Sequence, residues 1–152
     1  MTTTKQDNNG RIVVGVDGTA PSKDALLWAA RQAEMTGASL EAVLAWKAPV
    51  VAYGYTAGAL MGIDPELLAK QTLDETLRSV LGEPDGFEVV PIVVRGSAAA
   101  TLLDMAKGAD LLVVGTRGHG AVVGMLAGSV CEHCVAHATC PVVVVRHHEH
   151  AA

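Results

Sequence analysis

Five short aliphatic runs divide the chain at fairly even intervals. They are Ile12–Val16, Leu40–Trp46, Val89–Val94, Leu111–Val114 and Val142–Val145. Most of these runs are continuously apolar rather than alternating, which is typical of strands in a parallel sheet that is covered on both faces. The pattern therefore predicts five buried parallel strands.

Segments with helical periodicity separate these runs. In the first segment the apolar face carries Leu26, Ala29, Ala30 and Ala33, at the spacing of one helix stripe. The clearest helix start is Asp64-Pro65, a capping side chain followed by proline at the first helical position. The four predicted helices begin near Pro21, Asp64, Ala99 and Ser129, and they end near Gly37, Gly82, Gly108 and Ala138.

Strict alternation of strands and helices predicts an α/β fold. Right-handed crossovers between parallel strands lead to a doubly wound, three-layer sandwich around a five-stranded sheet, a Rossmann-like architecture. Sheets of this kind bind ligands at the carboxyl ends of strands, where the winding direction reverses. We therefore expect the ligand at the loops that follow the first and fourth strands, Asp17–Pro21 and Gly115–Gly128.

Composition narrows the class of protein. Half of the 152 residues are apolar and the net charge is −5, so we expect a folded chain that does not bind nucleic acid or anionic membranes, because basic patches are needed for both. The longest uncharged stretch, 48–63, is interrupted by proline and glycine, which excludes a membrane-spanning helix there.

The organisation expected from these features is one domain with short ends. The first residues, MTTTKQDNNGR, are polar and lack the apolar core of a secretion signal, so we expect a cytoplasmic protein. We predict a disordered N-terminus over residues 1–10, a single domain over 11–146 and a flexible tail over 147–152.

A glycine-rich loop carries the strongest chemical signal. Five of the fourteen residues from Gly115 to Gly128 are glycine, and Ser129 opens a helix directly afterwards. Glycine lets backbone N–H groups approach an oxyanion, and a helix N-terminus favours a phosphate. The alternative is a glycine-rich connection without a ligand. A P-loop is excluded because no Gly-Lys-Ser/Thr is present, and the spacing after the fourth strand does not fit a dinucleotide-binding dehydrogenase.

The glycine spacing resembles that of the universal stress protein family, in its ATP-binding branch. That branch has Gly, two residues, Gly, nine residues, Gly and then Ser or Thr, which fits Gly115, Gly118, Gly128 and Ser129. The opening Ile12-Val-Val-Gly-Val-Asp-Gly-Thr and the closing Cys-Pro-Val-Val-Val-Val also match family positions. The likeness covers residues 11–146 and implies a fold like that of the adenine nucleotide alpha hydrolases.

The resemblance implies a set of nucleotide contacts. The triphosphate would lie against backbone amides at Gly118, His119, Gly120, Ala121, Gly128, Ser129 and Val130. The ribose would lie near Gly115 and Asp17, and Trp46 would contact adenine through its backbone. ATP and Mg²⁺ are the implied cofactors.

Four of the candidate side chains and glycines have alternatives that the sequence leaves open. Asp17 suits a ribose hydroxyl or Mg²⁺, or it only shapes a turn with Gly18. Gly15 leaves room for the nucleotide or is a plain strand glycine. Arg117 and His119 either contact phosphate or are solvated.

Cysteine and histidine recur every third residue in Cys131, Cys134, His137 and Cys140. Steps of three drift by about 60° around a helix, so the set does not converge on one ion, and core packing by an apolar face of Val130, Cys131, Cys134, Val135 and Ala138 is the favoured interpretation. Zinc binding and redox chemistry are the alternatives. The tail, which begins at His147, is expected to be solvated.

Three functions follow from the sequence. The leading one is an ATP-binding stress-response or signalling protein whose bound state is recognised by an unknown protein partner. It is expected to form a homodimer through Val142–Val145, predicted to be an edge strand. The second is a slow ATPase or nucleotidyl-transfer enzyme, for which His119 is the one loop residue with suitable chemistry; we expect at most weak hydrolysis. The third is an interaction module without nucleotide.

Overall fold

A single parallel sheet organises the protein. The computed structural model describes residues 10–47, 62, 64–116 and 128–147. Its five strands are β1 (Arg11–Gly15), β2 (Ser39–Trp46), β3 (Val89–Arg95), β4 (Leu111–Gly115) and β5 (Val142–Val145). They lie in the order β3-β2-β1-β4-β5, and every neighbouring pair is parallel. The predicted parallel sheet is confirmed.

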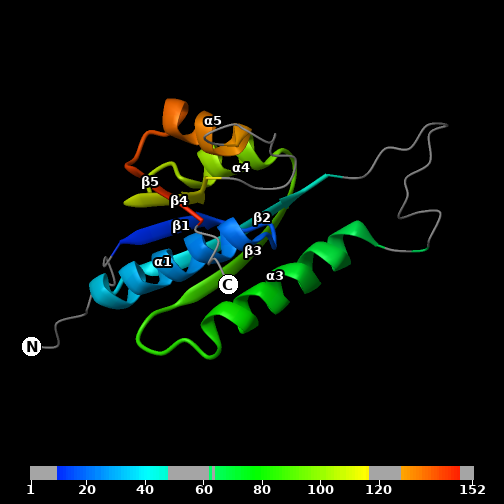
Figure 1. Ribbon diagram of the computed structural model, residues 1–152, viewed down its shortest axis with the longest axis horizontal. Coiled ribbons are helices and arrows are strands. Elements are labelled where there is room, and N and C mark those ends of the chain that lie inside the picture. Colours follow the sequence, from blue (N-terminus) through cyan, green and yellow to red (C-terminus); the bar gives the residue numbers. More distant parts are fainter. Residues whose placement is uncertain (1–9, 48–61, 63, 117–127, 148–152) are drawn as a thin grey trace, which may run out of the picture.

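Helices cover both faces of this sheet, which confirms the three-layer α/β fold (Figure 1). On one face lie α1 (Ala20–Thr36) and α3 (Pro65–Leu81), and on the other lie α4 (Ala98–Met105) and α5 (Ser129–His137). The predicted cap of α3 forms, because the Asp64 carboxylate accepts from the amide of Glu66 at 3.0 Å. The α4 helix ends at Met105, before Gly108, and a turn follows it.

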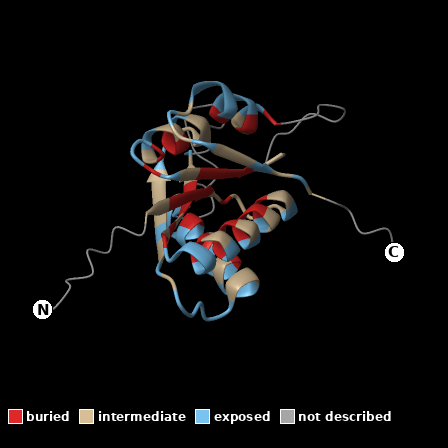
Figure 2. Ribbon diagram, turned by 90° about the vertical axis from the view of Figure 1, so that its left-hand side faces the viewer, coloured by how far each residue is buried: buried red, intermediate tan, exposed pale blue. Residues whose placement is uncertain are grey.

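The strands are mostly apolar because their side chains pack into two cores. Along β1, Ile12 and Val14 pack in the cluster under α1 and α3, whereas Val13 packs under α4 and α5. Side chains alternate between faces along a strand, so a strand with both faces covered is apolar at most positions; Glu41 of β2 is an exception and pairs with Arg11 at 2.8 Å. Figure 2 shows the buried residues along the strands and on the inward helix faces.

The order of the strands determines where a ligand site can form. From β1 the chain winds outward through β2 to β3, and then returns to the other side of β1 for β4 and β5. The winding direction therefore reverses between β1 and β4, whose carboxyl ends lie side by side. A doubly wound sheet leaves a crevice at such a point.

One edge of the sheet is β5. It pairs with β4 and with no other strand in the described part of the chain, as predicted for Val142–Val145. Among the residues that the structure describes, none forms a helix that is both long and apolar enough to span a membrane.

Candidate functional site

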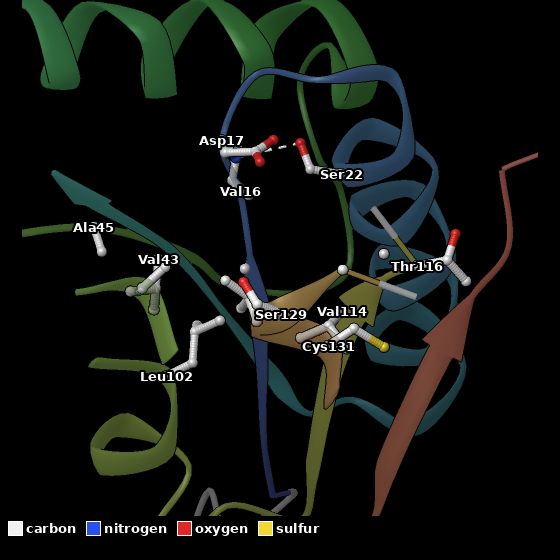
Figure 3. A pocket seen from close by; sticks show the side chains of 15 residues that line it. Val16, Asp17, Ser22, Val43, Ala45, Leu102, Val114, Thr116, Ser129 and Cys131 are labelled. Carbon is white, nitrogen blue, oxygen red and sulfur yellow. Dashed lines mark hydrogen bonds between the residues drawn. The ribbon is translucent and has the colours of Figure 1, made fainter. Parts of the chain in front are cut away.

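A cavity of about 200 Å³ opens at the carboxyl edge of the sheet, where β1 and β4 end (Figure 3). Its walls come from three strands and from the first turns of α1, α4 and α5. The lining residues are Gly15, Val16, Asp17, Ser22, Val43, Ala45, Ala98, Leu102, Val114, Gly115, Thr116, Gly128, Ser129, Val130 and Cys131. The cavity therefore lies at the predicted reversal point.

The turn between β1 and α1 forms one polar wall. Gly18 has a φ of 83°, a conformation that glycine adopts without strain. The Asp17 carboxylate accepts from the amide of Thr19 at 3.0 Å and from its hydroxyl, and the Asp17 amide donates to the Ser22 hydroxyl at 3.2 Å. Asp17 thus shapes the turn, and it also lines the cavity.

The first turn of α5 forms a second polar wall. Gly128 is the N-cap, and no side chain caps this helix. The amides of Ser129, Val130 and Cys131 have no acceptor within the helix, because the first-turn amides of any α-helix lie beyond the start of its hydrogen-bond ladder. All three residues line the cavity, and the positive end of the helix dipole lies there as well.

The amide of Gly128 is hydrogen-bonded within the protein and is not available to a ligand. Its amide donates to the carbonyl oxygen of Thr116 at 2.5 Å, and the Thr116 amide donates to the carbonyl oxygen of Val145 at 3.1 Å. These bonds tie the start of α5 to the ends of β4 and β5. The sequence predicts that the amides of Gly128, Ser129 and Val130 bind phosphate. The Gly128 amide is already hydrogen-bonded within the protein, so Ser129 and Val130 remain.

Two glycines at the cavity permit close approach of neighbouring elements. A β-carbon at Gly115 would lie 2.8 Å from the carbonyl oxygen of Pro21, in the α1 backbone. A β-carbon at Gly15 would lie 2.8 Å from a terminal methyl group of Leu102. Gly115 therefore lets the end of β4 pack directly against the start of α1, and Gly15 makes room for a side chain of α4.

Trp46 does not join the other predicted residues around the cavity. Side chains alternate along β2, so Val43 and Ala45 face the cavity while Trp46 packs with the core on the opposite face. Its carbonyl oxygen accepts from the amide of Gly96 at 2.8 Å, and the Arg95 guanidinium lies 5.7 Å from the centre of its ring. The contact expected between Trp46 and adenine is through the Trp46 backbone, so the direction of its side chain leaves that prediction untested.

The structure brings together six of the candidate residues: Gly15, Asp17, Gly115, Gly128, Ser129 and Val130. The predictions at Arg117, Gly118, His119, Gly120 and Ala121 lie outside the described residues. Sequence reasoning missed the remaining lining residues, Val16, Ser22, Val43, Ala45, Ala98, Leu102, Val114, Thr116 and Cys131. Several of these residues end a strand or begin a helix. Ligands of such sheets bind at the carboxyl ends of strands, so applying this rule to every strand would have pointed to Ala45 and Thr116.

The cysteines of α5 pack in the core, as favoured. Cys131 and Cys134 are buried, and burial raises the pKa of Cys134 to about 11, which keeps it a thiol at neutral pH. His137 lies exposed on the other side of the helix. No three His, Cys, Asp or Glu side chains group as metal ligands within the part of the chain that the structure describes.

Two expectations near the C-terminus were wrong. Val135 is 57% exposed, although it lies only about 40° around the helix from buried Cys131, so the buried side of α5 is narrower than the predicted apolar face. His147 is not simply solvated, because its Nδ1 lies 2.6 Å from an Asp24 carboxylate oxygen and its side chain is 29% exposed. The chain after β5 therefore contacts α1.

Comparison with known proteins gives one family. The model of the universal stress protein family matches residues 8–146. A universal stress protein of Mycolicibacterium smegmatis is 37% identical over 147 residues, covering 93% of this chain and 49% of the relative. One from Mycobacterium tuberculosis is 34% identical over 138 residues, covering 89% and 44%. The chain spans about half the length of these curated relatives.

Solved structures share the fold. The universal stress protein UspA from Lactobacillus plantarum has a TM-score of 0.73 at 24% identity, covering 91% of this chain and 98% of that one. A universal stress protein in complex with cAMP has a TM-score of 0.68 at 24% identity, covering 90% and 96%. One from Archaeoglobus fulgidus in complex with dAMP has a TM-score of 0.61 at 23% identity, covering 90% and 97%.

Proposed function

This chain belongs to the universal stress protein family, and from that premise we propose that it binds an adenine nucleotide in the cavity between β1 and β4. We propose ATP with Mg²⁺ as the bound form. Two neighbours of the same fold were solved with cAMP and dAMP, which supports the adenylate class. The ATP-binding glycine spacing in this sequence supports the triphosphate.

The observation that carries this proposal is the first turn of α5 at the cavity wall. Ser129 and Val130 provide backbone amides without helical acceptors, and an anion there gains from the helix dipole as well. A charge-assisted hydrogen bond contributes about 1.5–3 kcal/mol, and micromolar binding requires about 8 kcal/mol in total. The glycine loop, at Gly118, Gly120 and neighbouring positions, is proposed to supply the remaining amides.

The opposite wall suits a flat apolar base. Val43, Ala45 and Leu102 line it, and ligand sites generally combine an apolar surface with a few convergent polar groups. We therefore assign the base to this wall, at the end of β2, where the backbone contact with Trp46 stays a prediction. Adenine would lie beside Ala45, whose small side chain leaves room at the end of β2.

Asp17 and Gly115 remain the proposed ribose contacts. The carboxylate of Asp17 lines the cavity from the β1–α1 turn, and a hard oxygen ligand beside phosphates fits Mg²⁺, which takes one or two carboxylates together with phosphate oxygens. When bound, the ion would neutralise charge between this carboxylate and the phosphates. The role we propose is that of a stress-response or signalling module whose nucleotide state is read by another protein.

Nucleotide carried by the purified protein tests the function directly. We expect that denaturing the protein releases an adenine nucleotide into the supernatant, and that calorimetry on nucleotide-free protein gives tighter binding for ATP with Mg²⁺ than for AMP or cyclic AMP. Tighter binding of a monophosphate would overturn the ATP assignment but keep the adenylate class. Heat signals equal to buffer for all three ligands would contradict the proposed function.

We also propose that β5 pairs with its copy in a homodimer. Val144 is 36% exposed on this edge strand, and an apolar edge favours pairing with another strand. Light scattering at micromolar concentration is expected to give twice the chain mass, and Val144→Lys to give the single mass. Val135→Lys changes an exposed valine of α5 instead and should leave the dimer intact. A monomeric unmodified chain would refute the proposal.

A further inference from the structure

The outer face of α5 carries two histidines one helical turn apart. His133 and His137 are both exposed, and residues four apart are neighbours on a helix surface. Their ring centres lie 5.9 Å apart, with the rings tilted by 44°. Figure 2 shows the exposed outer side of this helix at the top of the molecule. The proposed nucleotide contacts are backbone amides in the first turn of the same helix.

One ring makes a hydrogen bond that selects its neutral tautomer. His133 Nδ1 lies 3.1 Å from the carbonyl oxygen of Ser129. A carbonyl oxygen only accepts, so Nδ1 must carry the hydrogen and donate it. In neutral imidazole the other nitrogen, Nε2, then holds the lone pair. Metal-binding histidines are oriented by this kind of second bond to a backbone carbonyl.

We propose that His133 and His137 form a surface site for a divalent transition-metal ion, with Zn²⁺ and Cu²⁺ as the best-matched ions. Imidazole suits Zn²⁺, Cu²⁺ and Ni²⁺, whereas Mg²⁺ and Ca²⁺ prefer oxygen ligands. A zinc–nitrogen bond is about 2 Å long, so two rings that share an ion must lie close together. The separation of 5.9 Å between the ring centres is short enough for both rings to reach one ion after side-chain rotation.

The cysteines beside these histidines do not belong to this site. Cys131 and Cys134 are buried in the core beneath α5, and both have a raised pKa because burial disfavours the thiolate. Zinc binds thiolates. The proposed site is therefore open, with two protein ligands, and water or a side chain of another molecule completes the coordination. An open site of this kind exchanges its metal readily, unlike a closed structural zinc site.

The test uses the full chain with His148→Ala and His150→Ala, so that these two histidines do not bind the probe. We expect this parent to bind Zn²⁺ in a competition titration against a chromogenic chelator, and Cu²⁺ more tightly, as the general order of metal affinities requires. His133→Ala and His137→Ala should each weaken Zn²⁺ binding about tenfold or more. Adding Mg²⁺ in millimolar amounts should not displace Zn²⁺.

Two matched controls keep the outcome decisive. His147→Ala removes a histidine that pairs with Asp24 and should leave Zn²⁺ affinity unchanged. Circular dichroism of each variant should equal that of the parent, because both ring positions are exposed. Unchanged Zn²⁺ affinity in the His133→Ala/His137→Ala double variant would overturn the proposal, as would no Zn²⁺ binding by the parent. The titration uses nucleotide-free protein, so neither result bears on the proposed nucleotide binding.

Discussion

Replacing Gly115 with alanine is expected to destabilise the protein by about 2–3 kcal/mol, in the range found when extra atoms are forced into a packed interior. The new β-carbon would lie 2.8 Å from the carbonyl oxygen and 2.9 Å from the carbonyl carbon of Pro21. Both atoms belong to the backbone, so β4 and the start of α1 must move apart. Urea unfolding followed by circular dichroism measures the loss.

Gly15→Ala is the matched control for this prediction. It adds the same methyl group one strand away, but its closest contact is the end of the Leu102 side chain, which can rotate. We expect a loss of about 1 kcal/mol or less, near the lower limit for overpacking. Nucleotide affinity should also fall more in Gly115→Ala than in Gly15→Ala, because moving the start of α1 away from β4 also moves the Asp17 turn. Equal losses of stability in the two variants would show that contact with the α1 backbone does not determine how much the added methyl group destabilises the protein.

The strand and helix pattern predicts most of this fold because its signals are local. Apolar runs and capping residues such as Asp64 act within a few positions, and each predicted strand appears within one residue of its place. Periodicity fails where a strand is apolar on both faces. For β2 the sequence does not tell which of Ala45 and Trp46 faces the ligand, because either face is buried.

The candidate site was predicted where backbone geometry is implied by residue type. Glycine after a strand and Ser129 at a helix start point to amides at one edge, and Gly15, Asp17 and Gly115 do lie there. The sequence around each amide does not tell which acceptor that amide will meet in the folded chain. The Gly128 amide donates to Thr116, twelve residues earlier, and only the folded chain reveals that bond.

The same limit explains the errors on α5. An apolar stripe predicts which side of a helix is buried, but not how wide that side is, and Val135 lies beyond it. Cys131 and Cys134 follow the stripe inward while His133 and His137 lie outward. In the sequence, the spacing of three residues suggests that His137 belongs with the cysteines. On the helix its neighbour is His133, which lies four residues earlier.

Replacing Ser129 with aspartate is expected to weaken ATP binding about a hundredfold, or about 2.7 kcal/mol, while the fold remains intact. Ser129 is exposed at the first position of α5 and lines the cavity. A carboxylate there complements the helix dipole, which stabilises helices by about 0.3–1 kcal/mol, yet it repels the phosphates proposed to bind the same amides. Calorimetry with ATP measures the affinity, and thermal unfolding measures the stability.

Ser129→Asn separates charge from shape in this experiment. Asparagine matches aspartate in size and remains neutral, so we expect a loss of affinity below about tenfold, with the remaining difference due to charge repulsion. That difference should shrink as salt is added, because exposed charges are screened. If aspartate and asparagine weaken ATP binding equally, the phosphates do not lie at the start of α5, and the nucleotide must be oriented differently in the cavity.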